Sequence, residues 1–476
     1  MLSFLLNFFP FYVILDYQKI NEDIMLDTKY TDRMKNLLRE DFEKYMATFD
    51  DERETALHIN RAKVKGDDFS SLPYGCEKIP YTTDGFYFSA EKPGNHPLHH
   101  AGMFYIQEPS AMAPVSALEG KLPEGIKILD ACASPGGKSS QAANFSPCKN
   151  IVVSNEIVPS RCKTLVGNIE RLGLRNSLVL NSDTQFLAKK FPYEFALVIC
   201  DAPCSGEGML RKSEQAREEW SEENVRLCAQ RQREILDNLA KCVDEGGYLL
   251  YSTCTFSTEE NEENVTYFLE NHPDFSLCET DEKFNGVTSE GIKDFCQGFD
   301  GKKVRRFYPH ISRGEGQFFA LFKREGELVP STEFSISDSS RPLTKDEKKA
   351  VDEFLSKTVC ESLNVRAYRD NLLVLCENMP VPDQHVFSCG VKLGEVKSGR
   401  VVPHHQFFSA YGDIFKIKVD LSSDSAEITK YLKGESFEVD SPNGWAVVTC
   451  DGIPLGGAKI VDGYLKNHYP KGLRLM

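Results

Sequence analysis

Short apolar runs alternate with amphipathic stretches through the middle of the chain. Five apolar runs have strand length and are predicted to be buried strands: 126–130, 151–156, 177–181, 195–200 and 248–251. The stretches between them are predicted helices: 138–144, 159–172, 184–190 and 221–243. Alternation of this kind indicates βαβ units, and so an α/β fold built on a doubly wound parallel sheet.

The longest of these helices has boundary signals at both ends. Ser221 is predicted to cap its N-terminus, and Gly246-Gly247 to end it. Elsewhere, apolar residues at three- and four-residue steps predict a helix over 28–60 and another over 343–358. The turn-forming Gly314-Glu315-Gly316 precedes a predicted buried strand, 318–322.

The chain opens with a nearly uninterrupted apolar run, 1–15. This run lacks the basic start and the small-residue cleavage site of a secretory signal peptide, and it is short for a membrane-spanning helix. Met25 begins a polar amphipathic segment. We therefore interpret 1–24 as an upstream extension from a misassigned start codon, with a signal peptide as the minor alternative, and we expect no membrane association.

The length and the cysteines bound the class of protein. With 476 residues the chain is expected to hold two to four domains, and the Ser/Pro-rich stretch 326–342 is a predicted linker. Its fifteen cysteines include no C-x-x-C pair, which argues against a disulfide framework and against a structural zinc site. Reduced cysteines are typical of a cytoplasmic protein.

The net charge of −15 argues against simple electrostatic binding to nucleic acid. The charge is uneven, however, because acidic residues dominate 257–290 and basic residues dominate 301–324. We interpret both runs mainly as solvated surface, with a basic RNA-facing patch as the alternative.

One loop has the composition of a cofactor site. It joins the first strand to the first helix and reads Cys132, Ala133, Ser134, Pro135, Gly136, Gly137 and Lys138. Small residues let backbone N–H groups approach a ligand at a helix N-terminus. The loop is neither G-x-G-x-x-G nor a Walker A sequence, and Glu156 ends the second strand, where a carboxylate can bind ribose hydroxyls. A nucleoside-bearing cofactor is predicted, and S-adenosylmethionine fits best.

Two cysteines each follow a predicted buried strand. Cys204 lies in Asp201-Ala202-Pro203-Cys204-Ser205-Gly206-Glu207-Gly208, and Cys254 lies in Ser252-Thr253-Cys254-Thr255-Phe256. Because the carboxyl ends of parallel strands form the ligand crevice of such a sheet, the two thiols are expected to share it. A thiolate is a strong nucleophile, so this pattern favours covalent catalysis, with packed core cysteines as the alternative.

These motifs resemble those of the Sun-type RNA 5-methylcytosine methyltransferases. The resemblance rests on Asp-Ala-Cys-Ala-Ser-Pro-Gly-Gly-Lys, Asp-Ala-Pro-Cys-Ser-Gly-Glu-Gly and Ser-Thr-Cys-Thr-Phe, which occur in this order. Residues 96–110 are similar to the segment that precedes the family's catalytic domain, and 314–319 to its last catalytic motif. The likeness runs from about Lys29 to the C-terminus and is strongest over 100–325.

The resemblance implies roles for individual residues. The loop 132–138 would bind S-adenosylmethionine, Glu156 would hold its ribose, and Asp183 would lie by its adenine. Asp201 would face the methionine part and the target base. Thr184 follows Asp183 where family members usually have glycine, which is a departure within the adenine pocket.

The family resemblance also separates the two cysteines. The cysteine of the Thr-Cys pair, Cys254, would be the nucleophile, and that of the Pro-Cys pair, Cys204, would help to release the product. DNA cytosine methyltransferases instead attack with the cysteine of a Pro-Cys pair, which would assign the nucleophile to Cys204. The residues following Cys204, Ser-Gly-Glu-Gly, favour the RNA pattern.

The implied architecture has flanking domains on both sides of a Rossmann-like methyltransferase core. The expected parts are an N-terminal α/β RNA-contacting domain, 25–115; the catalytic domain, 116–325; the linker, 326–342; a connecting domain, 343–395; and a PUA-like β-barrel domain, 396–476. In the last of these, His468 and Tyr469 stand among basic residues and are expected to meet RNA by phosphate contact and base stacking.

The function implied is S-adenosylmethionine-dependent methylation of carbon 5 of cytosine in small-subunit ribosomal RNA, by a monomer. Two alternatives stay open. The same chemistry could act on transfer RNA or on large-subunit ribosomal RNA, or the chain could be a non-catalytic RNA-binding factor of ribosome assembly. Retention of both cysteines, Glu156 and Asp201 argues against the second alternative.

Overall fold

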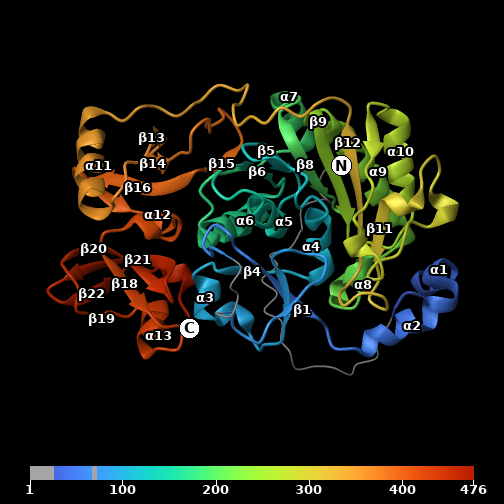
Figure 1. Cartoon of the computed structure of the whole chain (residues 1–476), viewed down its shortest axis with the longest axis horizontal. Helices are drawn as coiled ribbons and strands as arrows, with labels where there is room; N and C mark the ends of the chain where they lie inside the picture. The colour runs from blue at the N-terminus through green and yellow to red at the C-terminus, as the bar shows by residue number, and fades with distance from the viewer. Residues whose placement is uncertain (1–25, 67–71, 476) are drawn as a thin grey trace, which may run out of the picture.

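The computed structural model describes residues 26–66 and 72–475, so the predicted extension 1–24 lies outside the described residues. A nine-stranded sheet forms the centre of the molecule, with the N-terminal residues below it and the C-terminal residues at one end (Figure 1). Its strand order is β10-β12-β9-β8-β5-β6-β7-β15, and β11 pairs with β12.

Five strands of this sheet are parallel and correspond to the five predicted runs. They are β5 (Lys127–Asp130), β6 (Ile151–Asn155), β7 (Ser177–Leu180), β8 (Phe195–Asp201) and β9 (Val243–Thr253). The chain steps outward from β5 to β7 and then returns to place β8 on the other side of β5. This doubly wound order creates a topological switch between β5 and β8, where ligands bind in such folds.

Helices cover both faces of the sheet. One face packs against α7 (Thr184–Lys190), α9 (Glu222–Ala240) and α10 (Glu262–Asn271), and the other against α4 (Pro109–Ser116) and α5 (Gly137–Ala143). The helix α6 (Pro159–Leu172) packs beside β7. Burial on both faces explains why the parallel strands read as continuous apolar runs in the sequence.

The antiparallel strands extend the sheet at its two edges. On one side lie β12 (Gln317–Arg324), which contains the predicted strand 318–322, β10 (Phe275–Leu277) and β11 (Val304–Phe307). On the other side β15 (Val386–Cys389) pairs with β7, so the expected connecting segment contributes a strand to the central sheet. The short helix α8 (Glu214–Glu219) precedes α9.

Two helix predictions need correction. The helix predicted to end at Gly246-Gly247 ends at Ala240, and β9 begins at Val243 because that residue pairs with Phe195 of β8. Gly246, with φ of 67°, instead lies where the register between β8 and β9 shifts, and left-handed backbone of this kind is easiest for glycine. The other boundary is confirmed, because Ser221 accepts the Asn224 N–H and caps α9.

The single helix predicted over 28–60 is also wrong. The chain forms α1 (Thr28–Leu38) and α2 (Phe42–Ala47), separated at Arg39, whose φ is 51°. It then enters β1 (Thr55–Ile59), because this segment pairs with strands on both sides. Tertiary pairing therefore overrides the local helical spacing. The N-terminal sheet also holds β2 (Glu77–Lys78), β3 (Gly85–Phe88) and β4 (Phe104–Ile106), with α3 (Pro97–His100) beside it.

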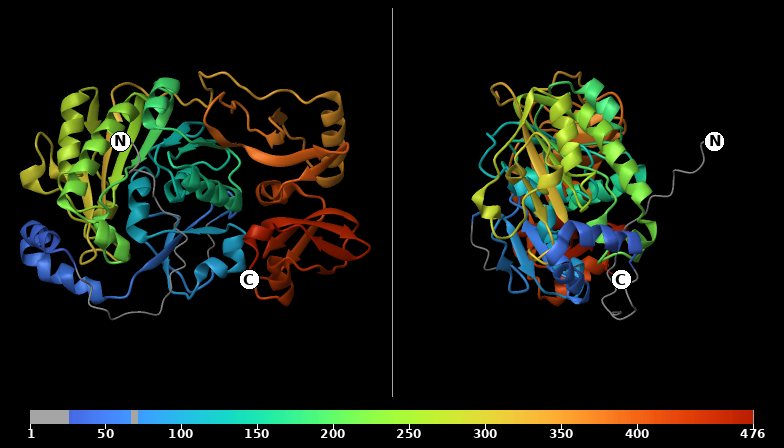
Figure 2. Two further views of the ribbon diagram at one scale, coloured as in Figure 1. Left: turned by 180° about the vertical axis from the view of Figure 1, so that it is seen from behind. Right: turned by 90° about the vertical axis from the view of Figure 1, so that its right-hand side faces the viewer.

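The C-terminal part contains two small sheets, seen from behind in Figure 2. The first joins β13 (Val365–Tyr368), β14 (Asn371–Val374), β16 (Val391–Lys397) and β17 (Arg400–Pro403), next to α11 (Lys345–Thr358) and α12 (His405–Tyr411). The second has five strands, β18 (Lys418–Leu421), β20 (Gly444–Cys450), β21 (Ile453–Val461), β22 (Tyr464–Asn467) and β19 (Phe437–Glu438), with α13 (Ala426–Lys433).

Tyr469 does not take the exposed position expected for base stacking. Its side chain is 3% exposed and its hydroxyl lies 3.0 Å from Nδ1 of His100, a residue of α3 in the N-terminal region. The ring also packs edge-on against His405. Tyr469 therefore joins the C-terminal sheet to the N-terminal region, whereas His468 remains exposed beside Trp445.

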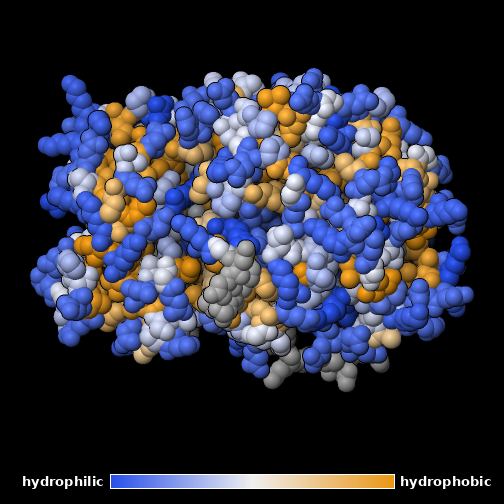
Figure 3. All heavy atoms as spheres, viewed as in Figure 1, coloured by the Kyte–Doolittle hydropathy of each residue, from blue (hydrophilic) through white to orange (hydrophobic). Residues whose placement is uncertain are grey.

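The surface shown in Figure 3 is largely hydrophilic, with hydrophobic residues in smaller groups. Within residues 26–66 and 72–475, every helix is too short or too polar to cross a lipid bilayer. The boundaries expected for the individual domains stay predictions, although β16 and β17 lie in one sheet on both sides of the expected boundary at 395.

Lys63 lies where three parts of the chain meet. Its Nζ lies within hydrogen-bonding distance of the carbonyl oxygens of Ala101 (2.6 Å), Arg171 (3.2 Å) and Pro454 (2.9 Å), and of Oγ of Ser409 (2.9 Å). These acceptors belong to the N-terminal region, to the end of α6, to β21 and to α12. Burial, followed by the charges of two arginines, lowers the pKa of Lys63 well below its usual range.

Replacing Lys63 with methionine should weaken the contact among these three parts. The change keeps the length of the side chain but leaves buried oxygens without their donor, which we expect to cost about 1–3 kcal/mol. Thermal unfolding and limited proteolysis measure the effect. Lys65→Met, at an exposed position two residues away, is the control. Equal melting temperatures for the two variants would show that the junction does not depend on Lys63.

Candidate active site at the carboxyl edge of the sheet

Glycines shape the predicted cofactor loop where β5 leads into α5. Gly136 has φ of 113° and caps α5, and an added Cβ there would lie 3.1 Å from Cδ1 of Leu165. A Cβ on Gly137 would lie 3.1 Å from the side-chain amide of Gln107. Neither position accommodates a larger side chain without movement of its neighbours. The loop is therefore held close to the carboxyl end of β5.

Asp130 ends β5 and is fully buried. Ser139 Oγ donates to its Oδ2 at 2.6 Å, and Ser154 Oγ donates in turn to Ser139 Oγ at 2.9 Å. Burial raises the pKa of Asp130 to about 7, and the nearby Asp201 adds to this increase. Among the residues described, Asp130 Oδ1 is buried without a hydrogen-bond partner. This orphaned oxygen offers an acceptor to a polar ligand beside the loop.

Asn155 joins the loops that follow the first three parallel strands, and sequence reasoning missed it. Its Nδ2 donates to the carbonyl oxygens of Ala131 (3.0 Å) and Ser182 (2.9 Å), and its Oδ1 accepts the Ser182 N–H at 3.1 Å. Its own carbonyl accepts the Ala133 N–H at 2.8 Å. The position of Asn155, directly before the predicted carboxylate Glu156, was the available signal. Its hydrogen-bonding partners could not be predicted, because they are far from it in sequence.

The two carboxylates predicted to bind the cofactor differ in their surroundings. Glu156 is 3% exposed, accepts the Val158 N–H at 2.9 Å and has Arg161 Nη1 3.4 Å from its Oε2. Asp183 is exposed and caps α7 by accepting the Phe186 N–H at 2.7 Å. Both stand at the carboxyl edge, after β6 and β7 respectively. The Cys132 thiol within the loop is buried, which raises its pKa.

Asp201 and Lys138 form an ion pair across this edge. Lys138 Nζ lies 2.9 Å from Asp201 Oδ2, and Ser252 Oγ donates to Asp201 Oδ1 at 2.7 Å. The lysine side chain is nearly buried, whereas the Asp201 side chain is 36% exposed. The pair therefore connects the start of α5 with the ends of β8 and β9, and it leaves the aspartate accessible at the switch point.

The structure brings Cys204 and Cys254 together. Their Sγ atoms are 3.3 Å apart, although fifty residues separate them in sequence. The hydrogen bond to Cys254, followed by burial, raises the pKa of the Cys204 thiol well above its usual range. Both side chains are half-buried at the end of adjacent parallel strands. The expected dithiol at the sheet edge is thus present as a direct sulfur–sulfur contact.

Glu207 fastens the two cysteine loops to each other. Its carboxylate accepts hydrogen bonds from the Thr255 hydroxyl (3.0 Å), the Phe256 N–H (3.0 Å), the Ser257 hydroxyl (2.8 Å) and the Trp220 indole N–H (2.9 Å). Four donors to one buried carboxylate match the acceptor capacity of its ionised form. The Glu-Gly pair after Cys204 was visible in the sequence motif. The hydrogen bonds by which Glu207 joins the two cysteine loops were not.

The motif 314–319 packs against the loop that carries Cys204. A Cβ on Gly208 would lie 2.8 Å from Cα of Gly316 and 2.8 Å from the Cys254 carbonyl oxygen. Glu108, which caps α4, also accepts the Glu315 N–H at 2.7 Å. The two segments predicted from the family resemblance, 96–110 and 314–319, therefore meet beside the cysteines.

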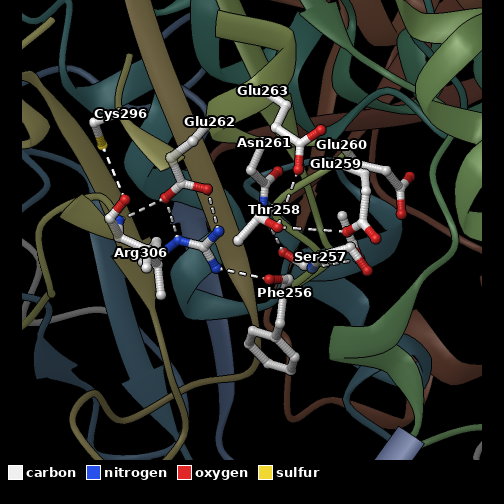
Figure 4. Close-up of polar contacts among 12 residues, drawn as sticks. Phe256, Ser257, Thr258, Glu259, Glu260, Asn261, Glu262, Glu263, Cys296 and Arg306 are labelled. Carbon is white, nitrogen blue, oxygen red and sulfur yellow. Dashed lines mark hydrogen bonds and ion pairs between the residues drawn. The ribbon is translucent and has the colours of Figure 1, made fainter. Parts of the chain in front are cut away.

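The acidic run after Cys254 is buried at its start, although later members such as Glu270 and Glu282 are exposed as predicted. Glu260 and Glu262 are both 0% exposed. Arg306, which is 1% exposed, donates from Nε to Glu262 Oε1 at 2.6 Å and forms a second, short contact from Nη2 to Oε2. It also donates to the Phe256 carbonyl at 2.8 Å, as Figure 4 shows. This ion pair lies directly behind the Cys254 loop.

The acidic and basic runs pair with each other in part. Besides Arg306 and Glu262, Arg324 contacts Asp274 at 2.9 Å and Lys303 contacts Glu279 at 2.8 Å. The runs meet because β11 and β12 bring the second next to α10 and β10. Arg306 is buried and so cannot belong to a basic RNA-facing patch, which stays a prediction for the other basic residues of 301–324.

Fold and site together define the class of this protein. It has a doubly wound α/β core, a small-residue loop suited to a nucleoside cofactor, and a dithiol next to an accessible aspartate at the switch point.

Residues 117–323 match the 16S rRNA methyltransferase RsmB/F family, 26–109 match the N-terminal domain of 16S rRNA methyltransferase RsmF, and 418–475 match the methyltransferase RsmF PUA domain.

Two similar proteins match nearly the whole chain. One, the Ribosomal RNA small subunit methyltransferase F of Erwinia tasmaniensis, is 30% identical over 93% of this chain and 96% of its own length. The protein of the same name from Vibrio vulnificus is 29% identical over 95% and 98%. The chain therefore belongs to the RsmB/F methyltransferase family, which confirms the family and the fold class predicted from its motifs.

Solved structures share the fold. A methyltransferase homolog from Pyrococcus horikoshii has a TM-score of 0.54 and 23% identity, covering 63% of this chain and 96% of its own. The structure of NSun6 from the same organism, with SFG, has a TM-score of 0.54 and 20% identity, covering 63% and 99%.

Arg306→Met should destabilise the protein by about 3–5 kcal/mol, because it leaves the Glu262 carboxylate buried without its cation. The midpoint of thermal or urea unfolding measures this effect. Arg226→Met removes an exposed ion pair with Glu223, and we expect that change to cost no more than about 1 kcal/mol. Similar losses in both variants would contradict the assigned importance of the buried pair.

Proposed function

We propose that this protein transfers a methyl group from S-adenosylmethionine to carbon 5 of cytosine in small-subunit ribosomal RNA, through a covalent adduct with Cys254. The observation that carries the proposal is the contact between the Cys204 and Cys254 sulfurs beside Asp201, at the switch point of a doubly wound sheet. A pair of thiols in this position suits covalent activation of a base followed by release.

The residues present at the edge of the sheet fit S-adenosylmethionine. The orphaned Oδ1 of Asp130 and the carboxylate of Glu156 offer acceptors on either side of the loop 132–138. Glu156 would bind ribose hydroxyls, Asp183 would lie by the adenine, and Asp201 would face the methionine part. The cofactor supplies an electrophilic methyl group on a sulfonium centre.

A nucleophilic cysteine is needed because carbon 5 of cytosine is a poor nucleophile. When the Cys254 sulfur forms a bond to carbon 6 of the base, carbon 5 gains the electron density of an enamine. After methylation, carbon 5 carries both a proton and the new methyl group. Loss of that proton restores the double bond between carbons 5 and 6, and the bond from carbon 6 to sulfur breaks.

The environment of Cys204 supports its assignment to the second stage. The raised pKa of Cys204 favours its protonated thiol, and its sulfur lies 3.3 Å from Cys254 Sγ. Cys254 is then the sulfur available for attack. In the release step the carbon-5 proton passes to water, the electron pair of the carbon 6–sulfur bond returns to Cys254, and the Cys204 thiol assists by donating a hydrogen bond to the departing thiolate. The reverse assignment, with attack by Cys204, is the alternative taken from DNA methyltransferases.

The RNA substrate is supported by the flanking parts of the chain. The N-terminal and C-terminal regions match the N-terminal and PUA domains of RsmF, and the relatives that match nearly the whole chain are named for small-subunit ribosomal RNA. With a net charge of −15, specificity would come from folded RNA shape and an extruded base rather than from bulk electrostatics. The monomeric state and the cytoplasmic location stay predictions.

The proposed activity predicts transfer of labelled methyl groups from S-adenosylmethionine to ribosomal RNA. Bisulfite sequencing of the product should then show protected cytosines in the small-subunit RNA. Transfer RNA and large-subunit RNA, tested in parallel, distinguish the alternative substrates. Absence of any modified cytosine in all three fractions would favour the non-catalytic assembly factor instead.

Replacing each of the two cysteines with alanine should block the reaction at a different step. Cys254→Ala should abolish transfer, because no sulfur then activates carbon 6, whereas Cys204→Ala should leave RNA covalently trapped on Cys254. Denaturing gel electrophoresis detects the trapped species. Cys148→Ala, which removes an exposed cysteine, is the matched control and should remain fully active. A trapped adduct in Cys254→Ala rather than Cys204→Ala would reverse the two roles.

Glu156→Gln should weaken S-adenosylmethionine binding by about 10-fold or more, because a charge-assisted hydrogen bond is worth about 1.5–3 kcal/mol. Isothermal titration calorimetry measures the affinity without RNA. Glu219→Gln, at the exposed last residue of α8, is the control. Unchanged affinity in Glu156→Gln would place the ribose elsewhere.

A further inference from the structure

A chain of four side chains connects the two cysteine loops beneath the sulfurs. Ser205 follows Cys204, and Thr255 follows Cys254; the hydroxyl oxygens of Ser205 and Thr255 are 2.9 Å apart. The Ser205 hydroxyl is also in short contact with Glu260 Oε1, and the Thr255 hydroxyl lies 3.0 Å from Glu207 Oε2. All four side chains are buried.

The two hydroxyl groups do not supply enough hydrogens for the contacts among these four side chains. Three contacts join the four groups, and each contact needs one hydrogen between its two oxygens. Ser205 and Thr255 supply only one hydroxyl hydrogen each. If both carboxyl groups were ionised, one of the three contacts would hold two buried oxygens without a proton between them. One of the two carboxyl groups must therefore supply the third hydrogen.

Glu207 cannot supply it. The Trp220 indole and the Phe256 backbone N–H are donors only, and they point at Oε1 and Oε2 respectively. The Ser257 and Thr255 hydroxyls complete a set of four contacts, two on each oxygen. Only a proton on Oε2 could enter the three contacts, and the Phe256 N–H would then have to bond to a carboxyl O–H oxygen, which is a much weaker acceptor than a carboxylate oxygen.

Glu260 can supply it, because its two oxygens differ. Oε2 accepts the Ser205 N–H at 3.0 Å and the Gln232 Nε2–H at 2.7 Å, whereas Oε1 contacts the Ser205 hydroxyl. The orientation of Gln232 is set by the Pro203 carbonyl, which accepts from the same Nε2 at 3.0 Å. Oε1 is thus free to carry a hydrogen toward Ser205.

The electrostatic surroundings agree with this assignment. Burial raises the pKa of Glu260 to about 7, and the neighbouring carboxylate of Glu207 adds to the increase. The hydrogen bonds from Ser205 and Gln232 act in the opposite direction but do not cancel the effect of burial.

We propose that Glu260 is a positioning residue. Its Oε1 carries a proton and donates a hydrogen bond to the Ser205 hydroxyl oxygen. The hydrogen bonds then run in one direction, from Glu260 through Ser205 and Thr255 to Glu207. This order ties the residue after Cys204 to the residue after Cys254 and so sets the separation of the two sulfurs. The benefit to catalysis rests on the proposed methyl transfer, whereas the protonation of Glu260 does not.

Substitution by glutamine distinguishes the two carboxyl groups. At position 260 the amide of glutamine reproduces a protonated carboxyl group: its oxygen accepts the two N–H donors and its NH2 donates to Ser205. At position 207 the same change places an NH2 group against donors, because both oxygens are fully occupied by them. Glutamine should therefore replace Glu260 and fail to replace Glu207.

The experiment compares Glu260→Gln, Glu260→Ala and Glu207→Gln in the full chain. We expect Glu260→Ala to lower kcat about 10-fold or more, because the link between the loops loses its donor. Glu260→Gln should restore kcat to within about twofold of the wild-type value, with KM for RNA unchanged. Glu207→Gln should lower both kcat and the melting temperature. A loss in Glu260→Gln as large as in Glu260→Ala would overturn the proposal.

Infrared spectroscopy tests the proton itself, without any activity. Near neutral pH, the difference between the wild-type and Glu260→Gln spectra should contain a protonated carboxyl C=O band, and the difference between the wild-type and Glu207→Gln spectra should not; the contribution of Asp130 cancels in both differences. A difference spectrum of wild-type and Glu260→Gln without this band would show that Glu260 is ionised and would overturn the proposal. If no RNA is methylated at all, the proposed function fails, but the infrared band and the melting temperatures still decide the protonation of Glu260.

Discussion

Burial of carboxyl groups beneath the two cysteines is the constraint on which the candidate site depends. Glu207 collects four donors, and Glu260 and Glu262 are fully enclosed, so each loop has a hydrogen-bonding partner that water cannot replace. Groups of this kind are costly when left without partners and stabilising when fully paired. The contact between Cys204 and Cys254 is therefore a product of the polar layer below it.

The parallel sheet supplies the second requirement, because it brings loops distant in sequence to one edge. Asn155 joins the loops after β5, β6 and β7, and the pair of Lys138 and Asp201 continues the same edge across the switch point to β8. Lys63 extends the connection to the C-terminal part of the chain. The N-terminal and C-terminal parts of the chain can keep a fixed position relative to the cysteines only if such junctions are rigid.

Local patterns in the sequence were sufficient for much of this architecture. The five parallel strands, the helices after them and the cap at Ser221 follow from apolar spacing and capping chemistry. Patterns failed where a distant partner decided the outcome. Thr55–Ile59 is a strand because neighbours pair with it on both sides, and Gly246 lies inside a strand because β8 lies beside it.

By itself, the sequence determined the fold class, the cofactor loop and the presence of two thiols at one edge, because these depend on residue types at short spacing. Only the tertiary structure decided which charges are inside the protein. Glu260, Glu262 and Arg306 belong to runs that looked like surface, yet they are buried because partners as far as 55 residues away in sequence fold over them. Tyr469 became buried for the same reason, through its contact with His100. Burial is a property of the packed chain, and no local pattern encodes it.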